Sequence, residues 1–234
     1  MILSLRDEAL GVHDCNRLRA HNVSALEAPV HRAVRQAYDE AIIECADGFI
    51  LTSQQAAFAL PETGKDRPVF TVGRASAASA RARGYHNVTW GPSDGAALAK
   101  LIAQDGGGQL CWLRAAKISF DMVRALRGAN IAVSEAVVYE MQPQTSWSQQ
   151  VIDAFEQGMV TAIMALSKAQ RDALVQLLDH HDLWHHIPVI DFYAVSPAVA
   201  EAAKDDGWQA VHIARRKRAI SVQAAVIVNA RTKE

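Results

Sequence analysis

The sequence has no long apolar run and no closely spaced pair of cysteines. None of its apolar stretches reaches the roughly 18–20 residues of a membrane span. The apolar start Met1–Leu5 is followed at once by charged residues, so we expect no signal-peptide core. The three cysteines are odd in number and widely spaced: Cys15, Cys45 and Cys111. Such thiols are typical of a reducing compartment, and we therefore expect a cytoplasmic protein.

An excess of charge of either sign is also lacking. Lys and Arg number 24 against 25 Asp and Glu, which gives a formal net charge of −1. This balance provides no general attraction to nucleic acid or to membranes. The content of 50% hydrophobic and 21% charged residues is that of a globular protein, and 234 residues suffice for one large domain or two small ones.

What the sequence does contain is a resemblance to itself. Ile2–Arg6 aligns with Leu110–Arg114 at an offset of 114 − 6 = 108. Further along, Phe49–Ser53 aligns with Ile163–Ser167 (163 − 49 = 114), and Thr71–Tyr85 aligns with Ala194–Trp208 (194 − 71 = 123). Offsets that grow only between units indicate loop insertions in a duplicated fold.

Each half alternates strands of about five residues with helices of roughly 10–14 residues, the pattern of parallel α/β sheets covered by helices on both faces. The expected strands lie near 2–5, 23–28, 48–52, 69–72 and 87–90, and near 109–113, 131–136, 161–166, 188–195 and 210–214. The sequence thus predicts two small doubly wound α/β domains of the flavodoxin type. The space between two such domains is a common place for a ligand.

The stretch Val72-Gly-Arg-Ala-Ser76 predicts a strand, a tight turn and the start of a helix. Small residues in the first helical turn leave its backbone N–H groups open to an anion. The alternative is an Ala-rich helix that packs closely on its sheet. Four serines that follow strands, Ser53, Ser76, Ser167 and Ser196, could bind a ligand or simply cap helices.

Several segments together resemble the uroporphyrinogen-III synthases. The segments are Leu51-Thr-Ser-Gln-Gln-Ala-Ala-Phe58, Val72-Gly-Arg-Ala-Ser-Ala77, Cys111-Trp-Leu-Arg114, Val137-Val-Tyr-Glu140, Leu166-Ser167 and Ala194-Val-Ser-Pro197. No single one is specific, but their order and spacing cover nearly the whole chain. The resemblance implies a crossed topology, in which the chain leaves its first domain early and returns after completing the second. We therefore expect residues 1–28 and 145–234 in one domain, 34–136 in the other, and an extended two-stranded linker of 29–33 and 137–144.

The resemblance also implies the chemistry. The substrate would be hydroxymethylbilane, a linear tetrapyrrole with eight carboxylates, which a lyase closes to uroporphyrinogen III with inversion of the last ring and loss of water. No metal, nucleotide or flavin cofactor is required. Tyr139 matches the tyrosine that assists departure of the hydroxyl, although a strand tyrosine with a structural role is the alternative. The expected substrate-binding residues are Thr52, Ser53, Gly73, Ser76, Arg114, Ser167 and Ser196. A monomer is expected, with a possible transient contact to the preceding pathway enzyme.

Departures from the family pattern leave alternatives open. Ala198 and Val199 stand where relatives commonly carry threonines, which favours a non-catalytic relative that binds a tetrapyrrole or another polyanion. A general two-domain small-molecule binder is a further alternative. The four histidines in His180–His186 could suggest a metal site, but a polar helix end is expected there. The basic run Arg215–Arg218 is typical of a solvated loop, and could also draw a polyanionic substrate.

Overall fold

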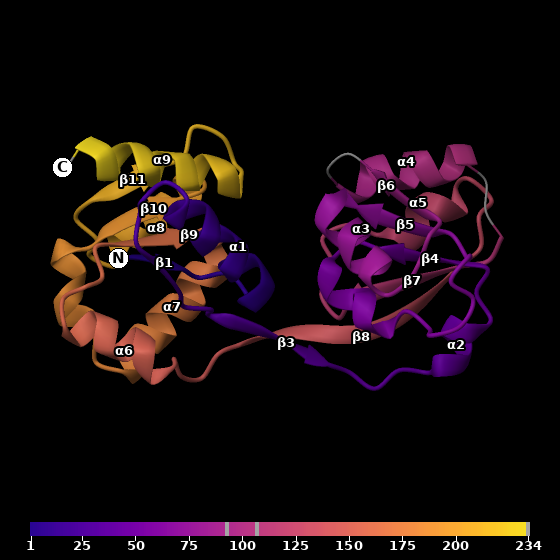
Figure 1. The fold of residues 1–234 in the computed structure, drawn as a ribbon, viewed down its shortest axis with the longest axis horizontal. Coiled ribbons are helices and arrows are strands. Elements are labelled where there is room, and N and C mark those ends of the chain that lie inside the picture. The colour runs from indigo at the N-terminus through magenta and orange to yellow at the C-terminus, as the bar shows by residue number, and fades with distance from the viewer. Residues whose placement is uncertain (92–93, 106–107, 233–234) are drawn as a thin grey trace. The chain divides into compact units, whose positions relative to one another are not determined.

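The chain folds into two compact units (Figure 1). The computed structural model describes residues 1–91, 94–105 and 108–232. Unit 1 consists of Met1–Arg32 and Gln142–Glu234, and unit 2 consists of Ala33–Met141. Each unit contains one mainly parallel sheet with helices packed on it, so the α/β fold class predicted from the sequence is confirmed.

Unit 1 has a five-stranded parallel sheet in the order β11-β10-β9-β1-β2. Counted along the chain within the unit, this is the order 2-1-3-4-5 of flavodoxin-like sheets. The strands are β1 (Ile2–Ser4), β2 (Ala25–Glu27), β9 (Ala162–Ala165), β10 (Asp191–Ala194) and β11 (Val211–Ile213). The helices are α1 (Glu8–Arg19), α6 (Gln149–Glu156), α7 (Lys168–His180), the 3₁₀ helix η2 (Trp184–Val189), α8 (Pro197–Asp205) and α9 (Ala219–Thr232).

Unit 2 has a six-stranded sheet in the order β3-β8-β7-β4-β5-β6. Its strands are β3 (His31–Arg35), β4 (Gly48–Leu51), β5 (Val69–Val72), β6 (Val88–Gly91), β7 (Leu110–Ala115) and β8 (Val133–Pro143). Its helices are α2 (Glu40–Glu44), the 3₁₀ helix η1 (Gln54–Ala59), α3 (Gly73–Ala82), α4 (Gly95–Asp105) and α5 (Met122–Arg127). The five strands from β8 to β6 are parallel, and they follow the order of unit 1 with the chain circularly permuted.

The internal repeat recurs in the strand register of both sheets. In unit 1, Ile2 of β1 is paired with Ala162 of β9, and in unit 2, Leu110 of β7 is paired with Gly48 of β4. The offsets 110 − 2 = 108 and 162 − 48 = 114 are those of the sequence alignment. Strands β1 and β2 therefore complete a sheet whose other three strands come from the second half of the chain.

Buried side chains alternate between the two faces of the unit 2 sheet, as the period of a strand requires. Phe49 and Leu51 pack with small residues of α3 and η1 in one core cluster. Ile50 of the same strand packs in a second cluster with side chains of α4 and α5. The helices thus cover both faces and leave the carboxyl ends of the parallel strands at one edge.

The expected linker segments are continuous with the sheet of unit 2. The Gln36 amide donates to the Val138 carbonyl, and the Gln144 amide donates to the Val30 carbonyl, both over 2.9 Å. Because 36 + 138 and 30 + 144 both equal 174, β3 and β8 run antiparallel. Residues 137–143 form the second part of strand β8, which is extended and paired with β3.

The strand expected at 188–195 is shorter than its apolar pattern suggested. Residues Trp184–Val189 form the 3₁₀ helix η2, which contains Pro188, and β10 begins at Asp191. Proline has no N–H to donate to a strand ladder, so a turn of helix is the better conformation before the strand.

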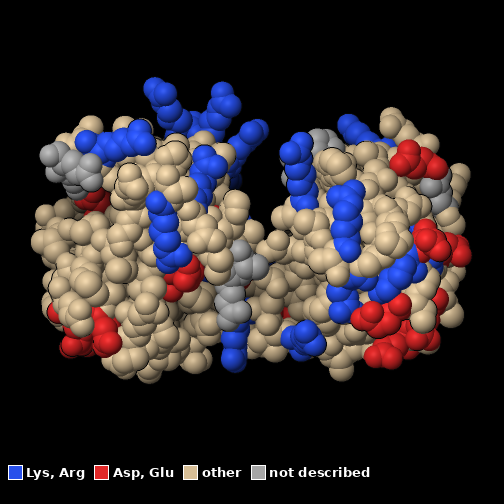
Figure 2. Space-filling model, in the orientation of Figure 1, with Lys and Arg blue, Asp and Glu red and all other residues tan. Residues whose placement is uncertain are grey.

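On the face of unit 2 that Figure 2 draws, Asp and Glu side chains gather mainly on one side, and Lys and Arg side chains lie mainly on the other. No helix in the described part of the chain is long and apolar enough to cross a membrane.

Candidate active site

A cavity of about 340 Å³ lies at the carboxyl edge of the unit 2 sheet. Segments that follow β4, β5, β6 and β7 contribute to it, together with one residue of β8. The lining residues are Thr52, Ser53, Val72, Asp94, Gly95, Trp112, Ala115, Lys117, Ile118, Ser119, Phe120 and Tyr139. Ligands of open α/β sheets bind outside the carboxyl ends of the strands, so this cavity is the leading candidate site of unit 2.

Thr52 and Ser53 enter the cavity directly after β4. The Ser53 hydroxyl caps η1 by accepting a hydrogen bond from the Gln55 amide over 3.2 Å. The Thr52 hydroxyl accepts a hydrogen bond from the Trp112 indole Nε1 over 3.3 Å. These contacts fix both hydroxyl oxygens, and each hydroxyl keeps a proton that it can donate to a ligand.

The first turn of α3 lies beside this cavity and has no side-chain cap. Its N-cap residue is Val72, which lines the cavity and makes no capping hydrogen bond. Gly73 is the first helical residue, with φ of +73°, and a Cβ added there would meet no atom within 4 Å. The backbone N–H groups at this end therefore stand in an open, electropositive position.

Ser76 does not cap this helix. It lies one turn inside α3 and is 4% exposed, so the interpretation of Ser76 as an N-cap is wrong. An N-cap at Ser76 would have required a later helix start, but α3 begins at Gly73, where glycine tolerates the positive φ.

Tyr139 reaches the cavity from β8 through a bulge in the sheet. Arg114 is paired with Val137, whereas Ala115 is paired with Tyr139, so β8 has one extra residue at Val138. The Tyr139 carbonyl accepts a hydrogen bond from the Ala116 amide over 2.9 Å. Bulges redirect side chains, and this one accompanies a tyrosine that is 5% exposed and lines the cavity.

Arg114 is held by protein groups near the bulge. Its Nε donates to the Glu135 carboxylate over 2.6 Å, and its Nη1 donates to the carbonyls of Ala115 and Ala116 over 2.9 and 3.2 Å. Arg114 does not line the cavity. These contacts support the backbone that carries the bulge, a structural role that the strand-end motif did not suggest.

The cavity also contains residues that sequence reasoning missed. Lys117 is exposed, and Asp94 caps α4 by accepting from the Ala97 amide over 2.8 Å. Trp112 and Phe120 supply aromatic walls. Each lies on or just after a strand of the parallel sheet, so reading the residues that follow every strand would have found most of them.

Ser167 and Ser196 belong to unit 1. They follow β9 and β10, which are adjacent in the sheet with Ala165 paired to Ala194. The Ser167 hydroxyl caps α7 by accepting from the Gln170 amide over 3.1 Å, whereas Ser196 makes no capping bond at the start of α8. Both serines lie at the carboxyl edge of their own sheet.

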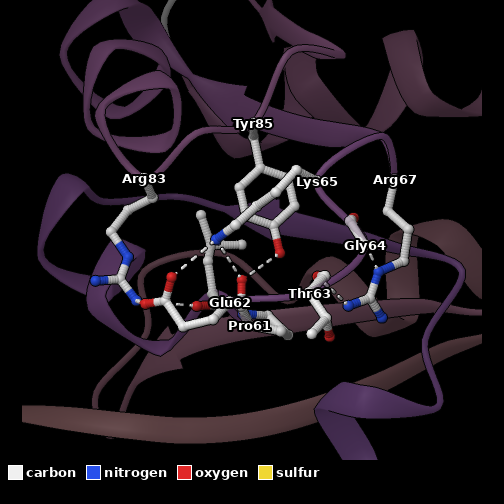
Figure 3. Close-up of polar contacts among 9 residues, drawn as sticks. Pro61, Glu62, Thr63, Gly64, Lys65, Arg67, Arg83 and Tyr85 are labelled. Carbon is white, nitrogen blue, oxygen red and sulfur yellow. Dashed lines mark hydrogen bonds and ion pairs between the residues drawn. The ribbon is translucent and has the colours of Figure 1, made fainter.

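The loop that follows η1 is fixed by a network of paired polar groups (Figure 3). The Tyr85 hydroxyl and the Lys65 ammonium both donate to the Pro61 carbonyl, over 3.0 and 2.7 Å. Glu62 forms ion pairs with Lys65 and Arg83. Burial raises the pKa of the Tyr85 phenol. Because these groups bind one another, this network is a structural clamp.

The histidines at the end of α7 are not arranged around a metal position. No group of three or more His, Cys, Asp or Glu side chains in the described residues could hold an ion. His181 stacks on Trp147 with centroids 6.2 Å apart and accepts the Trp147 backbone N–H at Nε2 over 3.2 Å. This histidine therefore packs on Trp147 and binds its backbone.

Comparison with known proteins gives a family match and several similar solved structures. The family model for uroporphyrinogen-III synthase HemD matches residues 15–222. The solved structure of uroporphyrinogen-III synthetase from Helicobacter pylori is similar, with a TM-score of 0.60 and 13% identity, over 97% of this chain and 98% of that one. The solved structure of a mutant uroporphyrinogen III synthase from Thermus thermophilus is also similar, with a TM-score of 0.51 and 16% identity, over 100% of this chain and 99% of that one. These low identities show the fold alone, and no curated protein matches.

Proposed function

This chain belongs to the uroporphyrinogen-III synthase family, and we propose that the cavity at the carboxyl edge of unit 2 is where it removes water from hydroxymethylbilane. The reaction of the family closes this linear tetrapyrrole to uroporphyrinogen III with inversion of the last pyrrole ring. The observation that carries the proposal is that Tyr139, Thr52 and Ser53, from two separate strands, line one cavity.

Tyr139 is assigned to the departure of the hydroxyl group. The pyrrole nitrogen lone pair expels the hydroxyl from the adjoining carbon, and the C–O bond breaks. The departing oxygen accepts a hydrogen bond from the Tyr139 phenol and leaves as water once protonated, while the pyrrole N–H releases a proton to give the azafulvene. A phenol has an ordinary pKa of about 10, so it suits a hydrogen-bond donor better than a full proton donor.

Ring inversion depends more on control of the substrate's conformation than on acid–base catalysis. The substituted carbon of the last ring attacks the azafulvene carbon to form a spiro intermediate, which fragments and recloses with that ring inverted. Holding the two reacting carbons together supplies much of the rate advantage. The aromatic walls of Trp112 and Phe120 offer flat apolar surfaces for pyrrole rings.

Substrate carboxylates are assigned to the hydroxyls of Thr52 and Ser53 and to the open N-terminus of α3 at Gly73. Ser76 is buried in the same helix, one turn from that end. Arg114 acts indirectly, because it holds the backbone next to Tyr139. In unit 1, Ser167 and Ser196 are further proposed contacts, supported by their place at the carboxyl edge of its sheet.

We also propose that the protein works in the cytoplasm as a monomer and receives its unstable substrate directly or by diffusion from the preceding enzyme. The thiols support the location, since Cys15 and Cys111 are buried and free. Burial raises the pKa of the Cys15 thiol to about 12, so it is unreactive at neutral pH.

Replacing Tyr139 with Phe tests the assignment. The ring volume is kept and the donor is lost, so the rate should fall about 10²-fold, at the low end for one acid or hydrogen bond. The KM should change little. Tyr85→Phe is the control, because the Tyr85 hydroxyl binds the Pro61 carbonyl; it should lower the melting temperature and leave the rate unchanged. Full activity in Tyr139→Phe would show that Tyr139 is structural.

A further inference from the structure

A second cavity of unit 2 shares a wall with the first. It measures about 330 Å³ and is lined by Ala33, Arg35, Gln54, Gln55, Phe58 and Tyr139. Tyr139 lines both cavities. Among the described residues that line the second one, Arg35 alone carries a charge, so its local field favours an anion.

Arg35 is oriented by an aromatic ring. Its guanidinium carbon lies 4.4 Å from the ring centroid of Phe58. Stacking on a ring fixes the guanidinium plane and leaves the N–H groups at its edge to bind a planar acceptor. Within the described part of the chain, the Arg35 side chain makes no hydrogen bond or ion pair. The arginines of the clamp in Figure 3 differ, since Arg67 and Arg83 donate to carbonyls and to Glu62.

Gln54 supplies a second donor at the same cavity. Its side-chain Nε2 is buried and has no hydrogen-bond partner among the described residues. A buried amide N–H is costly to leave unpaired, so an acceptor oxygen on a ligand in this cavity would remove that cost. An anionic oxygen between Gln54 and Arg35 would satisfy both.

We infer that the second cavity binds a carboxylate side chain of the substrate, held by the Arg35 guanidinium and the Gln54 amide. The inference rests on the proposed function, because it needs a polycarboxylate whose leaving hydroxyl is at Tyr139. The acetate and propionate arms of the reacting pyrrole extend from the ring that carries this hydroxyl. Phe58 and Ala33 provide apolar walls for their methylene groups. This subsite holds the pyrrole that carries the hydroxymethyl group in place beside Tyr139.

The test compares Arg35→Gln with Arg32→Gln. Both changes remove one exposed cation from β3, but Arg32 lies on the opposite face because side chains of a strand alternate. Arg35→Gln should raise the KM for hydroxymethylbilane about tenfold and leave kcat within twofold. This is the result expected when a charged contact that holds substrate and transition state equally is lost. Gln54→Leu should raise the KM several-fold, and Arg32→Gln should leave both KM and kcat unchanged.

The Kd for uroporphyrinogen III under anaerobic conditions provides a second readout. Arg35→Gln and Gln54→Leu should each raise this Kd by the same factor by which they raise the KM for hydroxymethylbilane. Unchanged KM and Kd in both variants, or equal effects of Arg35→Gln and Arg32→Gln, would overturn the subsite. If the wild-type protein bound uroporphyrinogen III but formed none from hydroxymethylbilane, the proposed function would fail, and the Kd series would still test the subsite.

Discussion

At the scale of single residues, His181 links protonation to stability. Its Nε2 accepts the Trp147 backbone N–H, so the folded state requires the neutral ring. Burial, and then the neighbouring His180, lower the pKa of His181. At pH values between the lowered pKa of the folded state and the ordinary histidine pKa of about 6.5, the unfolded state binds more protons than the folded state. The contribution of His181 to stability is therefore full above that ordinary value and is lost as the pH falls below it.

Replacing His181 with Phe should remove this part of the pH dependence. Phe keeps a ring to stack on Trp147 but loses the acceptor, which should cost about 1 kcal/mol at neutral pH. Urea unfolding between about pH 7.5 and 5.5, a range that brackets the ordinary histidine value, should then show a smaller loss of stability than in the wild-type protein. His21→Asn, at an exposed position, should keep the wild-type profile. An unaltered profile in His181→Phe would refute this account.

Some of the residues that line the cavity were predicted from the sequence. Tyr139, Thr52 and Ser53 followed from the family resemblance, and all three line the cavity. Arg114 was expected to bind substrate, and motif matching does not reveal that its Nε donates to Glu135 and its Nη1 to two carbonyls. The contact with Glu135 joins residues that are distant in sequence, so it becomes visible only in the fold.

At the scale of elements, the start of α3 is the feature that the proposed site depends on. Gly73→Ala should destabilise the protein by about 1–2 kcal/mol, because alanine is strained at a positive φ. The added methyl would also crowd the open N–H groups, so the KM should rise about 2–5-fold, the range for an anion at a helix N-terminus.

The matched control is Gly207→Ala. Gly207 has φ of +97° and open space around it, but it follows the end of α8 in unit 1. This variant should lose similar stability in urea unfolding and keep the wild-type KM. Equal KM values for the two variants would show that no substrate group approaches Gly73.

The alternation of strands and helices was predictable because its signals are local: the spacing of apolar residues along the chain and the glycines that end helices. The expected strand at 69–72 coincides with β5. The strand expected at 188–195 begins only at Asp191, because the apolar pattern of this stretch hid the effect of Pro188, which lies in the 3₁₀ helix η2.

At the scale of the whole molecule, the repeat predicted two related sheets but did not by itself decide which strands share one. The register of Ile2 with Ala162 shows that β1 lies beside β9. If each domain were contiguous in the sequence, β1 would lie beside β4 in one sheet. The local apolar patterns of the strands would be the same in that arrangement. Only the family resemblance suggested the crossed connection in advance.

The crossing predicts that unit 2 can be excised. Because the β3–β8 pairing places Arg32 opposite Gln142, an Asn-Gly turn between them should close unit 1 as a hairpin. The closed unit 1, and Ala33–Met141 alone, should each melt cooperatively, since each has its own core. Circular dichroism would check this, and a fragment without a cooperative transition would contradict it.

The most direct test of the account mixes the purified protein with freshly made hydroxymethylbilane, then oxidises and separates the product isomers. Without an enzyme the substrate closes uninverted to the symmetric isomer I. The account predicts rapid formation of isomer III in proportion to the amount of protein, with Ala198 and Val199 no obstacle to turnover. Formation of isomer I alone, at the rate seen without protein, would contradict it.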